Sequence, residues 1–339
     1  MQKLKAILVG FGNIAEAMAH DSVKAKTTEY ASHAQVLRDH PAFDWLAVVD
    51  PSAEKREIAK SRWGVTTAVA DLQDLPQAVQ PDLAVIATTP ALRTSVIEQL
   101  PTIKAVMVEK PLGADISSAR TFVELCDQRD IKAQVNFWRR GDSTSRALAD
   151  GGLVSRIGPP QTALGIYGNG FRNNAIHMID YTRMLLGEVR AVQALGEPQT
   201  TPGLPIPNDV AIPFSLMLES GVQVTFHSLN FEFYRENGLE IWGEKGQLSL
   251  LQEGWRLTTH PLRPHSTLGG AQEINFDKAD KLESGAGRAF YAMYDNLADA
   301  VTNGSPLWSS ARSGLRNEEI LDAVILSAKQ NFQRIAIVE

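Results

Sequence analysis

The sequence predicts an α/β protein with two domains. The first, residues 1–137, is expected to be a doubly wound parallel sheet, and the second, residues 138–339, an α+β domain with a largely antiparallel open sheet. Two observations support this: short apolar runs alternate with helical patterns as far as residue 137, and hairpin signals follow in the second half. The chain has 339 residues, 44% of them hydrophobic, enough for two cores at about 150 residues per domain.

Five runs in the first half are typical of strands buried on both faces, because they are short, rich in Val, Ile and Ala, and do not alternate with polar residues. They span Lys5–Val9, Trp45–Val49, Leu83–Ala87, Val106–Val108 and Lys132–Phe137. Helical patterns lie near residues 13–20, 52–62, 91–99 and 115–129, and Asp115 can cap the last of these. Residues 21–40 resemble an inserted, polar, helix-rich excursion. The alternation favours parallel strands joined by helices.

The second half has a different character. A helix is predicted over 174–187, ended by Gly187, and the proline-rich stretch 196–213 is predicted to be an extended loop. Residues 211–219 and 222–230 flank Ser220-Gly221, and 238–242 and 247–251 flank a second turn at 243–246, so both pairs predict hairpins. A polar, Gly-rich loop over 260–287 and helices near 288–303 and 314–330 complete the second domain.

Composition excludes several classes of partner. The net charge is −6 and no Lys/Arg block occurs, so neither nucleic acid nor a membrane surface is expected to bind. No run of 18 apolar residues is present to span a bilayer. The one cysteine, Cys126, lies in an apolar helical pattern and is expected in the core, and a chain without an intrachain disulfide suits the cytoplasm. The seven histidines lack metal-ligand spacing, so no metal is expected.

The first strand runs into a glycine turn, Gly10-Phe11-Gly12-Asn13-Ile14-Ala15. Gly10 permits the tight turn, Gly12 lets the backbone approach a pyrophosphate, and Ala15 is small enough for helix–strand packing. Such a turn between a strand and a helix predicts a dinucleotide-phosphate cradle, with Asn13 and Ile14 among the cofactor contacts.

Asp50 ends the second predicted strand. A carboxylate there would accept hydrogen bonds from the adenosine ribose and repel a 2′-phosphate, which favours NAD. Lys55 and Arg56 follow closely, so NADP is not excluded. Asp50 lies 38 positions after Gly12 (50 − 12), whereas the usual spacing is about 20. A helix cap or a solvated loop acid is therefore the alternative interpretation.

Glu109-Lys110-Pro111 follows the apolar run 105–108. A lysine between a carboxylate and a proline at a strand's carboxyl end lies where open α/β sheets bind ligands. The motif therefore predicts an ionisable group beside the cofactor. Thr88 and Thr89, which follow another strand, and Glu109 itself are further candidates for cofactor contacts.

Six motifs occur together in the order known from one family, and the chain resembles the glucose–fructose oxidoreductase/inositol dehydrogenase/rhizopine-catabolism (Gfo/Idh/MocA) family. They are Gly10–Ala15, Pro81–Pro90, Val108–Leu112, Val135–Arg140, His177–Asp180 and Glu240–Gly246. The resemblance implies an N-terminal Rossmann domain and hydride transfer between a nicotinamide and a secondary alcohol of a sugar or cyclitol, with Lys110 at the reacting hydroxyl. It also implies a homodimer or homotetramer formed through the open sheet.

His177 is the predicted base, because its ordinary pKa lies close to neutrality. Lys110 would polarise the oxygen or shuttle the proton. Asn173 lies four residues before His177, where the family usually has an acid; it can orient the ring or bind a hydroxyl but cannot take a proton. Arg93 likewise replaces a histidine often found in the family. The alternative for His177 is a core residue bonded to Asp180 or Tyr181.

Arg139, Tyr167 and Asn174 are predicted to bind substrate hydroxyls, although arginines at a domain surface are more often solvated. Asp180 is expected to be a structural partner. Two other functions stay open at this point. One is an NAD-dependent glycosidase that acts by transient oxidation, and the other is a dinucleotide-binding regulator without catalysis. Asn173, in place of the family's usual acid, is compatible with both.

Overall fold

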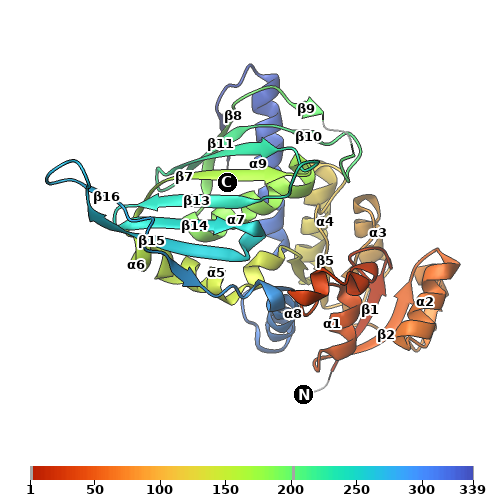
Figure 1. Cartoon of the computed structure of the whole chain (residues 1–339). Coiled ribbons are helices and arrows are strands. Elements are labelled where there is room, and N and C mark those ends of the chain that lie inside the picture. Colours follow the sequence, from red (N-terminus) through yellow and green to blue (C-terminus); the bar gives the residue numbers. More distant parts are fainter. Residues whose placement is uncertain (1–2, 201–202, 339) are drawn as a thin grey trace. The chain divides into compact units, whose positions relative to one another are not determined.

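The computed structural model describes residues 3–200 and 203–338. The chain divides into two units (Figure 1). The first unit takes the chain up to Gly141 together with Gly287–Leu315, and the second takes Asp142–Ala286 together with the chain from Arg316 onward. The segment 287–315 thus lies between two parts of the second unit in sequence but belongs to the first unit.

The first unit contains a six-stranded parallel sheet in the order β3-β2-β1-β4-β5-β6. The strands are β1 (Leu4–Val9), β2 (Phe43–Val49), β3 (Thr67–Val69), β4 (Leu83–Ile86), β5 (Ala105–Val108) and β6 (Lys132–Val135). All five predicted strands are confirmed. The edge strand β3 is not predicted, because it is only three residues long and half-buried. The order reverses between β1 and β4, as in a doubly wound sheet.

Both faces of this sheet are buried, as the lack of polar alternation predicts. Leu8 and Met107 on one face and Ile7 and Val106 on the other are fully buried. Helices α1 (His33–Asp39) and α8 (Ala286–Asn303) contribute side chains to the layer that contains Leu8. The other helices are α2 (Ala53–Trp63), α3 (Arg93–Glu98) and α4 (Ile116–Gln128), and Asp115 caps α4 as predicted.

The helix predicted at 13–20 is wrong. Residues 13–16 form turns, only a short 3₁₀ helix (Ala17–His20) follows, and a second one spans Lys24–Lys26. The regular helix is α1, and its first turn lies next to the end of the glycine turn, because the Ala34 N–H donates to the Ala15 carbonyl at 2.9 Å. Its residues Ala34 and Leu37 are buried in the core. The last part of the predicted polar excursion 21–40 is therefore a helix of the core, which begins later in the sequence than the helix predicted at 13–20.

The second unit contains a ten-stranded sheet in the order β16-β15-β14-β13-β7-β12-β11-β8-β18, with β17 paired to β15. The described pairs are antiparallel except β7 with β12. The strands are β7 (Pro160–Gly168), β8 (Val189–Ala194), β11 (Phe214–Leu218), β12 (Gln223–Leu229), β13 (Gly238–Gly243), β14 (Gly246–Leu251), β15 (Arg256–Pro264), β16 (Gln272–Ile274), β17 (Asp280–Leu282) and β18 (Ile335–Ala336).

Both predicted hairpins are confirmed, since β11 pairs with β12 and β13 with β14. The predicted loop 196–213 is largely irregular but includes the short pair β9 (Gln199–Thr200) and β10 (Val210–Ala211). The predicted loop over 260–287 is correct only in part, because β15, β16 and β17 occupy 260–264, 272–274 and 280–282. These strands are polar, and their sequences lack the apolar alternation that identifies a strand.

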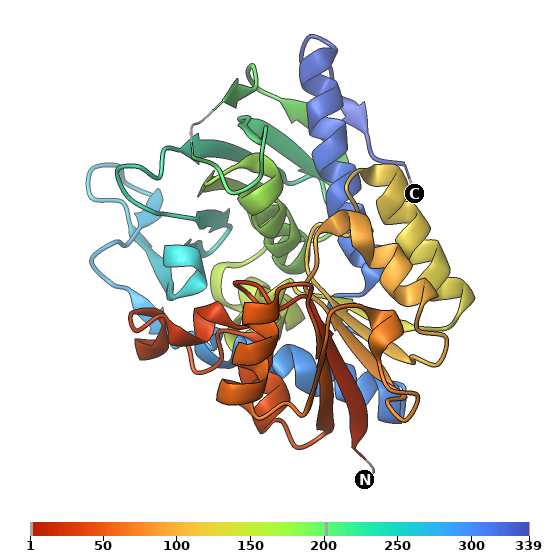
Figure 2. The same ribbon diagram turned by 90° about the vertical axis from the view of Figure 1, so that its right-hand side faces the viewer.

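Helices of the second unit lie on one face of its sheet (Figures 1 and 2). They include α5 (Ser143–Ala147), α6 (Leu153–Ile157), α7 (Ile176–Leu186) and most of α9 (Ala311–Lys329), and α7 ends at Gly187 as predicted. Side chains on the helix face, such as Phe226 and Ile241, are fully buried, whereas Leu164 on the opposite face is 41% exposed. None of the described helices has the length and apolar character needed to cross a membrane.

Cys126 lies in α4 and is buried, which confirms its predicted place in the core. Burial raises the pKa of its thiol to about 12. The thiol therefore stays protonated at neutral pH and is a poor nucleophile.

Candidate active site

The glycine turn lies at the carboxyl end of β1, between the ends of β2 and β4. Gly10 has a φ of +86°, and its N–H donates to the carbonyl of Val49 at 2.8 Å. A Cβ on Gly10 would lie 2.8 Å from the carbonyl oxygen of Ala87. Glycine satisfies both the positive φ and this close approach, and a side chain there would have to displace the backbone after β4.

Gly12, in contrast, borders open space. A Cβ on Gly12 would meet only the Nζ of Lys55, at 3.9 Å. None of the hydrogen bonds described for this turn uses the N–H groups of Gly12, Asn13 or Ile14. Backbone N–H groups at a helical turn, with an ammonium nearby, attract a phosphate. These residues therefore fit the pyrophosphate of a dinucleotide.

Asp50 connects the end of β2 to the glycine turn. One carboxylate oxygen accepts from the Phe11 N–H at 2.7 Å and the other from the Ser52 N–H at 2.9 Å, and the residue is 5% exposed. Ser52 in turn caps α2 through the Lys55 N–H. Each carboxylate oxygen can accept two hydrogen bonds, so these contacts leave capacity for a ribose hydroxyl.

Arg93 joins the ends of β4 and β5. Its guanidinium donates to the main-chain carbonyls of Glu109 and Thr88, the latter at 3.2 Å, and the residue is 2% exposed. It thereby holds the Thr88–Thr89 backbone against the Glu-Lys-Pro motif. From the sequence, Arg93 is noted only because it replaces a histidine common in the family. Its i, i+3, i+4 spacing with Val96 and Ile97, which are buried, is the signal that its side chain points inward.

Glu109 follows β5, and two side chains hold its carboxylate. His33 Nε2 and Asn136 Nδ2 lie 3.1 Å and 2.5 Å from Glu109 Oε1. Burial raises the pKa of this carboxyl, but the hydrogen bonds from His33 and Asn136 and the charge of Lys110 outweigh it, and the pKa lies below its ordinary value. Glu109 is therefore ionised at neutral pH, directly before the half-buried Lys110.

The cofactor candidates of the first unit share one edge of its sheet. Gly10, Asp50, Thr88 and Glu109 follow β1, β2, β4 and β5, and these strands are parallel. Their carboxyl ends therefore meet at the point where the strand order reverses, which is where doubly wound sheets bind ligands. His33 joins this group from α1 and is not among the residues that the sequence predicts for the site.

In the second unit, the candidates Asn173, Asn174 and His177 lie where a helix begins after β7. A π-helical turn, Phe171–Ala175, leads directly into α7. The Asn173 side chain donates to the Asn169 carbonyl at 3.0 Å, and that of Asn174 donates to Asn237 Oδ1 at 3.3 Å. His177 follows Asn173 by four residues and is half-buried.

Asp209, in the proline-rich loop, caps this helix. Its carboxylate oxygens accept from the N–H groups of Arg172 and Asn173, each at 3.0 Å, and the residue is 4% exposed. A carboxylate at a helix N-terminus is stabilised by the helix dipole. The sequence gives no local sign of this cap, because the partners are 36 residues apart.

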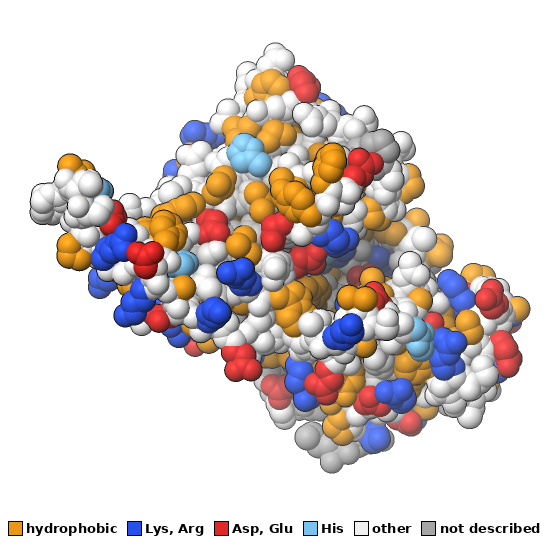
Figure 3. Space-filling view, in the orientation of Figure 1, with side chains coloured by type: hydrophobic (Ala, Val, Ile, Leu, Met, Phe, Trp, Pro, Cys, Tyr) orange, Lys and Arg blue, Asp and Glu red, His pale blue; other side chains and the backbone are white. Residues whose placement is uncertain are grey.

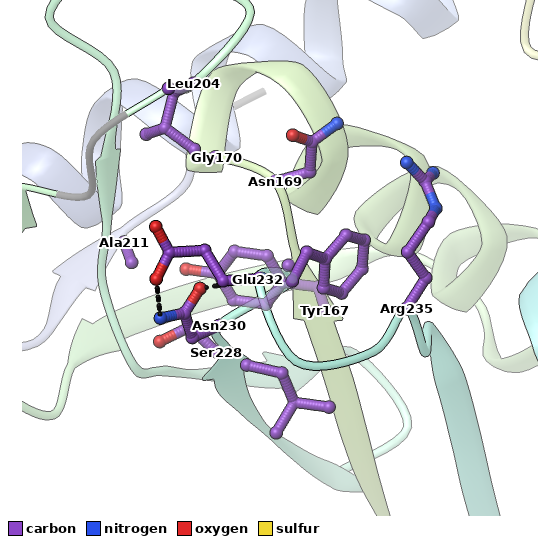
Figure 4. A pocket seen from close by; sticks show the side chains of 13 residues that line it. Tyr167, Asn169, Gly170, Leu204, Ala211, Ser228, Asn230, Glu232 and Arg235 are labelled. Atoms are coloured by element: carbon purple, nitrogen blue, oxygen red, sulfur yellow. Dashed lines mark hydrogen bonds between the residues drawn. The ribbon is translucent and has the colours of Figure 1, made fainter.

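A cavity of about 300 Å³ lies beside this helix start, at the ends of β7 and β12 (Figure 4). Its polar lining comes from Asn169, Ser228, Asn230, Glu232 and Arg235. Asn230 donates to Glu232 at 3.0 Å, and Arg235 donates to Glu253 at 3.0 Å. Amide, carboxylate, hydroxyl and guanidinium groups around one cavity suit a ring that has several hydroxyls.

All three predicted substrate residues, Arg139, Tyr167 and Asn174, are buried. The Tyr167 hydroxyl donates to the Ile212 carbonyl at 2.7 Å and accepts from the Ile212 N–H at 2.9 Å, so it supports the proline-rich loop while Tyr167 lines the cavity. Burial raises the pKa of Tyr167. Arg139 is 5% exposed, with its guanidinium 4.5 Å from the centre of the Trp138 ring. It is thus not a solvated surface arginine.

Other polar groups near α7 have structural partners. Asn317 donates to Asp180 at 2.8 Å, in keeping with the structural role predicted for that carboxylate. The Tyr181 hydroxyl lies 2.5 Å from Ser145 Oγ. Across residues 3–200 and 203–338, no three His, Cys, Asp or Glu side chains are grouped so as to hold a metal ion.

Comparison with known proteins gives relatives for both halves of the chain. Two relatives are named inositol 2-dehydrogenase. The one from Mycolicibacterium gilvum is 28% identical over 73% of this chain and 70% of its own length. The one from Rhizobium meliloti is 27% identical over 46% of this chain, and the match spans about half of that relative, 51%. A levoglucosan dehydrogenase structure with NADH and L-sorbose has the same fold, with a TM-score of 0.77, 17% identity and 99% of each chain covered.

Family models match most of the chain. Residues 4–137 match the model described as "Oxidoreductase family, NAD-binding Rossmann fold". Residues 167–337 match the one described as "Oxidoreductase family, C-terminal alpha/beta domain". The chain therefore belongs to the Gfo/Idh/MocA family of oxidoreductases, whose N-terminal domain is an NAD-binding Rossmann fold.

Proposed function

We propose that this NAD-binding oxidoreductase acts on a secondary alcohol of a sugar, a sugar derivative or a cyclitol. The Glu109–Lys110 pair is the observation that supports this most strongly. An ionised Glu109 beside Lys110 lies at the same sheet edge as the glycine turn, where a proton-transfer group has to be for alcohol chemistry. The two relatives named inositol 2-dehydrogenase support the substrate class.

The catalytic roles are proposed for Lys110, His177 and Asn173. When NAD is bound, it supplies the hydride acceptor or donor. Lys110 donates a hydrogen bond to the reacting oxygen, and His177 takes the hydroxyl proton, which must leave as the carbon is oxidised. Asn173 binds a substrate hydroxyl or orients His177, because an amide cannot take a proton.

The remaining substrate contacts are proposed within the second unit and at Arg139. The cavity at the ends of β7 and β12 holds the substrate ring, with Tyr167 in its wall and Asn174 hydrogen-bonded to Asn237 behind it. Arg139 supplies guanidinium donors to the ring hydroxyls. Planar, charged donors of this kind favour ligands with several oxygens.

The cofactor contacts are proposed for the edge of the first sheet. The N–H groups of the glycine turn, from Gly12 to Ile14, hold the pyrophosphate, and Asp50 accepts from the adenosine ribose. Thr88, Thr89 and Glu109 would supply further contacts to the cofactor. NAD is preferred over NADP because the buried Asp50 carboxylate would repel a 2′-phosphate.

The test is the absorbance of reduced nicotinamide, measured with NAD and with NADP across a panel of inositols, aldoses, uronates and amino sugars. We expect NAD-dependent oxidation of at least one member of the panel, with turnover by NADP at least about tenfold lower, which corresponds to 1.4 kcal/mol. Cofactor binding without turnover on the whole panel would contradict the proposed substrate class.

We also propose that the protein forms a homodimer or homotetramer through the sheet face that its own helices leave uncovered. Hydrophobic side chains are spread over this face (Figure 3), and Leu164 in β7 is 41% exposed there. We expect Leu164→Lys to reduce the mass measured by sedimentation equilibrium. Leu326→Lys on α9 is the matched control, because Leu326 is also 41% exposed. A monomeric wild type would contradict the proposal.

A cytoplasmic location is proposed on the chain's one cysteine, Cys126, which is buried and free. A fold that needs no disulfide suits a reducing compartment. Fractionation of the source cells, with the protein detected by a specific antibody, tests this location, and recovery from the extracellular fraction would contradict it.

A further inference from the structure

The buried imidazole of His33 contacts two segments that are far apart in the sequence. His33 is the first residue of α1, directly after the Ser32 cap, and its side chain is 0% exposed. Nε2 lies 3.1 Å from Glu109 Oε1, after β5, and Nδ1 lies 2.6 Å from the Tyr294 hydroxyl on α8. Both ring nitrogens therefore have partners within the first unit.

The chemistry of the partners sets the direction of these hydrogen bonds. The Glu109 carboxylate has no proton to give, so His33 Nε2 carries the proton and donates. Burial and the charge of Glu109 raise the pKa of Tyr294 well above its ordinary value, so the phenol keeps its proton and can donate to Nδ1. The Asn136 amide adds a second donor to the same oxygen, Glu109 Oε1.

We propose that His33 is a positioning residue for the Glu-Lys-Pro motif: its ring, supported by Tyr294, holds the Glu109 carboxylate beside Lys110. The inference rests on the proposed function, because it assumes that Lys110 is the group that works on the substrate. His33 itself acts through Glu109 and is not assigned a contact with substrate or cofactor.

The groups around Glu109 explain why one donor matters. They come from five segments: His33 from α1, Arg93 from α3, Asn136 after β6, Tyr294 from α8, and Lys110 next in the chain. Arg93 holds the main-chain carbonyl and not the carboxylate. Without the His33 donor, a buried carboxylate gains a proton or turns toward water. Lys110 then loses the negative charge that favours its ammonium form, and its pKa falls.

Amine labelling of the protein without substrate tests this directly. The rate at which an amine reagent modifies Lys110 is followed against pH by peptide mass spectrometry, with the exposed Lys60 as internal reference. His33→Gln keeps an N–H that can reach Glu109, whereas His33→Asn is one bond too short. The matched control is His40→Gln, because His40 is also buried and also contacts a carboxylate, Asp295, at 3.0 Å.

We expect His33→Asn to raise the labelling of Lys110 about tenfold at pH 8, as a fall of about one unit in its pKa requires. His33→Gln and His40→Gln should match wild type, and Lys60 should not change. Equal labelling of Lys110 in wild type and a folded His33→Asn would overturn the proposal. These readouts need no substrate, so they can fail or succeed independently of the proposed function.

A second measurement covers the case in which His33→Asn does not fold. Wild-type protein with ¹⁵N-labelled histidine shows by NMR which ring nitrogen of His33 bears the proton. We expect Nε2 to be protonated from pH 6 to pH 9. A neutral ring with the proton on Nδ1 and a bare Nε2 would overturn the proposal, because such a ring cannot donate to Glu109.

Discussion

Replacing Lys110 with alanine is expected to lower kcat by about 10³-fold while the Kd for NAD changes by no more than about threefold. A positioned proton-transfer group contributes typically 10²–10⁴-fold to a rate, and Lys110 is the cationic side chain directly after Glu109. The phosphate contacts proposed at the glycine turn follow another strand and stay intact. Steady-state kinetics on the substrate found in the panel, with NAD titrated by fluorescence, measures both quantities.

Two controls separate proton transfer from charge. Lys110→Arg keeps a cation but cannot release its proton near neutral pH, so it should remain at least about 10²-fold below wild type. Lys104→Ala removes a surface lysine, 64% exposed, whose ion pair with Asp82 spans 2.8 Å, and should leave kcat unchanged. A Lys110→Ala enzyme that kept a tenth or more of wild-type turnover would contradict the catalytic role.

Replacing Asp50 with alanine is expected to weaken NAD binding at least about 100-fold, equivalent to about 2.7 kcal/mol. The carboxylate accepts from Phe11 and Ser52, and the change leaves both backbone donors without this acceptor. Each orphaned buried donor costs about 1–3 kcal/mol, so the melting temperature should fall as well. Calorimetric titration with NAD and a thermal melt measure the two effects.

Asp50→Asn is the informative companion. The amide keeps one acceptor for the glycine turn but loses the negative charge, so the ratio of NAD affinity to NADP affinity should fall about tenfold or more if the charge excludes a 2′-phosphate. An Asp50→Ala protein that bound NAD as tightly as wild type would contradict the ribose role and leave only the structural one.

Local patterns predict much of this fold because they depend on neighbours in the sequence. The glycine turn, the Asp115 cap and the hairpin at Ser220-Gly221 are each encoded within a few residues, and all are confirmed in the structure. The place of Glu109 at a strand's carboxyl end is predicted for the same reason, from the apolar run before it.

Contacts between distant segments could not be predicted in this way. Asp209 caps the α7 segment from a loop 36 residues away, and Tyr294 meets His33 across 261 positions. The strands near residues 260–282 are not predicted for another reason. At a sheet edge they are held by pairing with β14 or β15, and their sequences do not need an apolar alternation. The first helix is misplaced because an excursion separates the glycine turn from the residues that pack on the sheet.

The segment between the glycine turn and α1 also determines where the protein can tolerate changes in chain length. The exposed and half-buried stretch 17–29 lies outside the core, and the residues on either side of it are held together, since the Ile14 and Ala15 carbonyls accept from the His33 and Ala34 N–H groups at 3.2 and 2.9 Å. When the ends of a loop are held this close, doubling its length costs only about 0.6 kcal/mol in closure entropy. The segment is therefore a site where insertions and deletions can accumulate, and where a foreign peptide can be grafted, while the register of α1 is preserved.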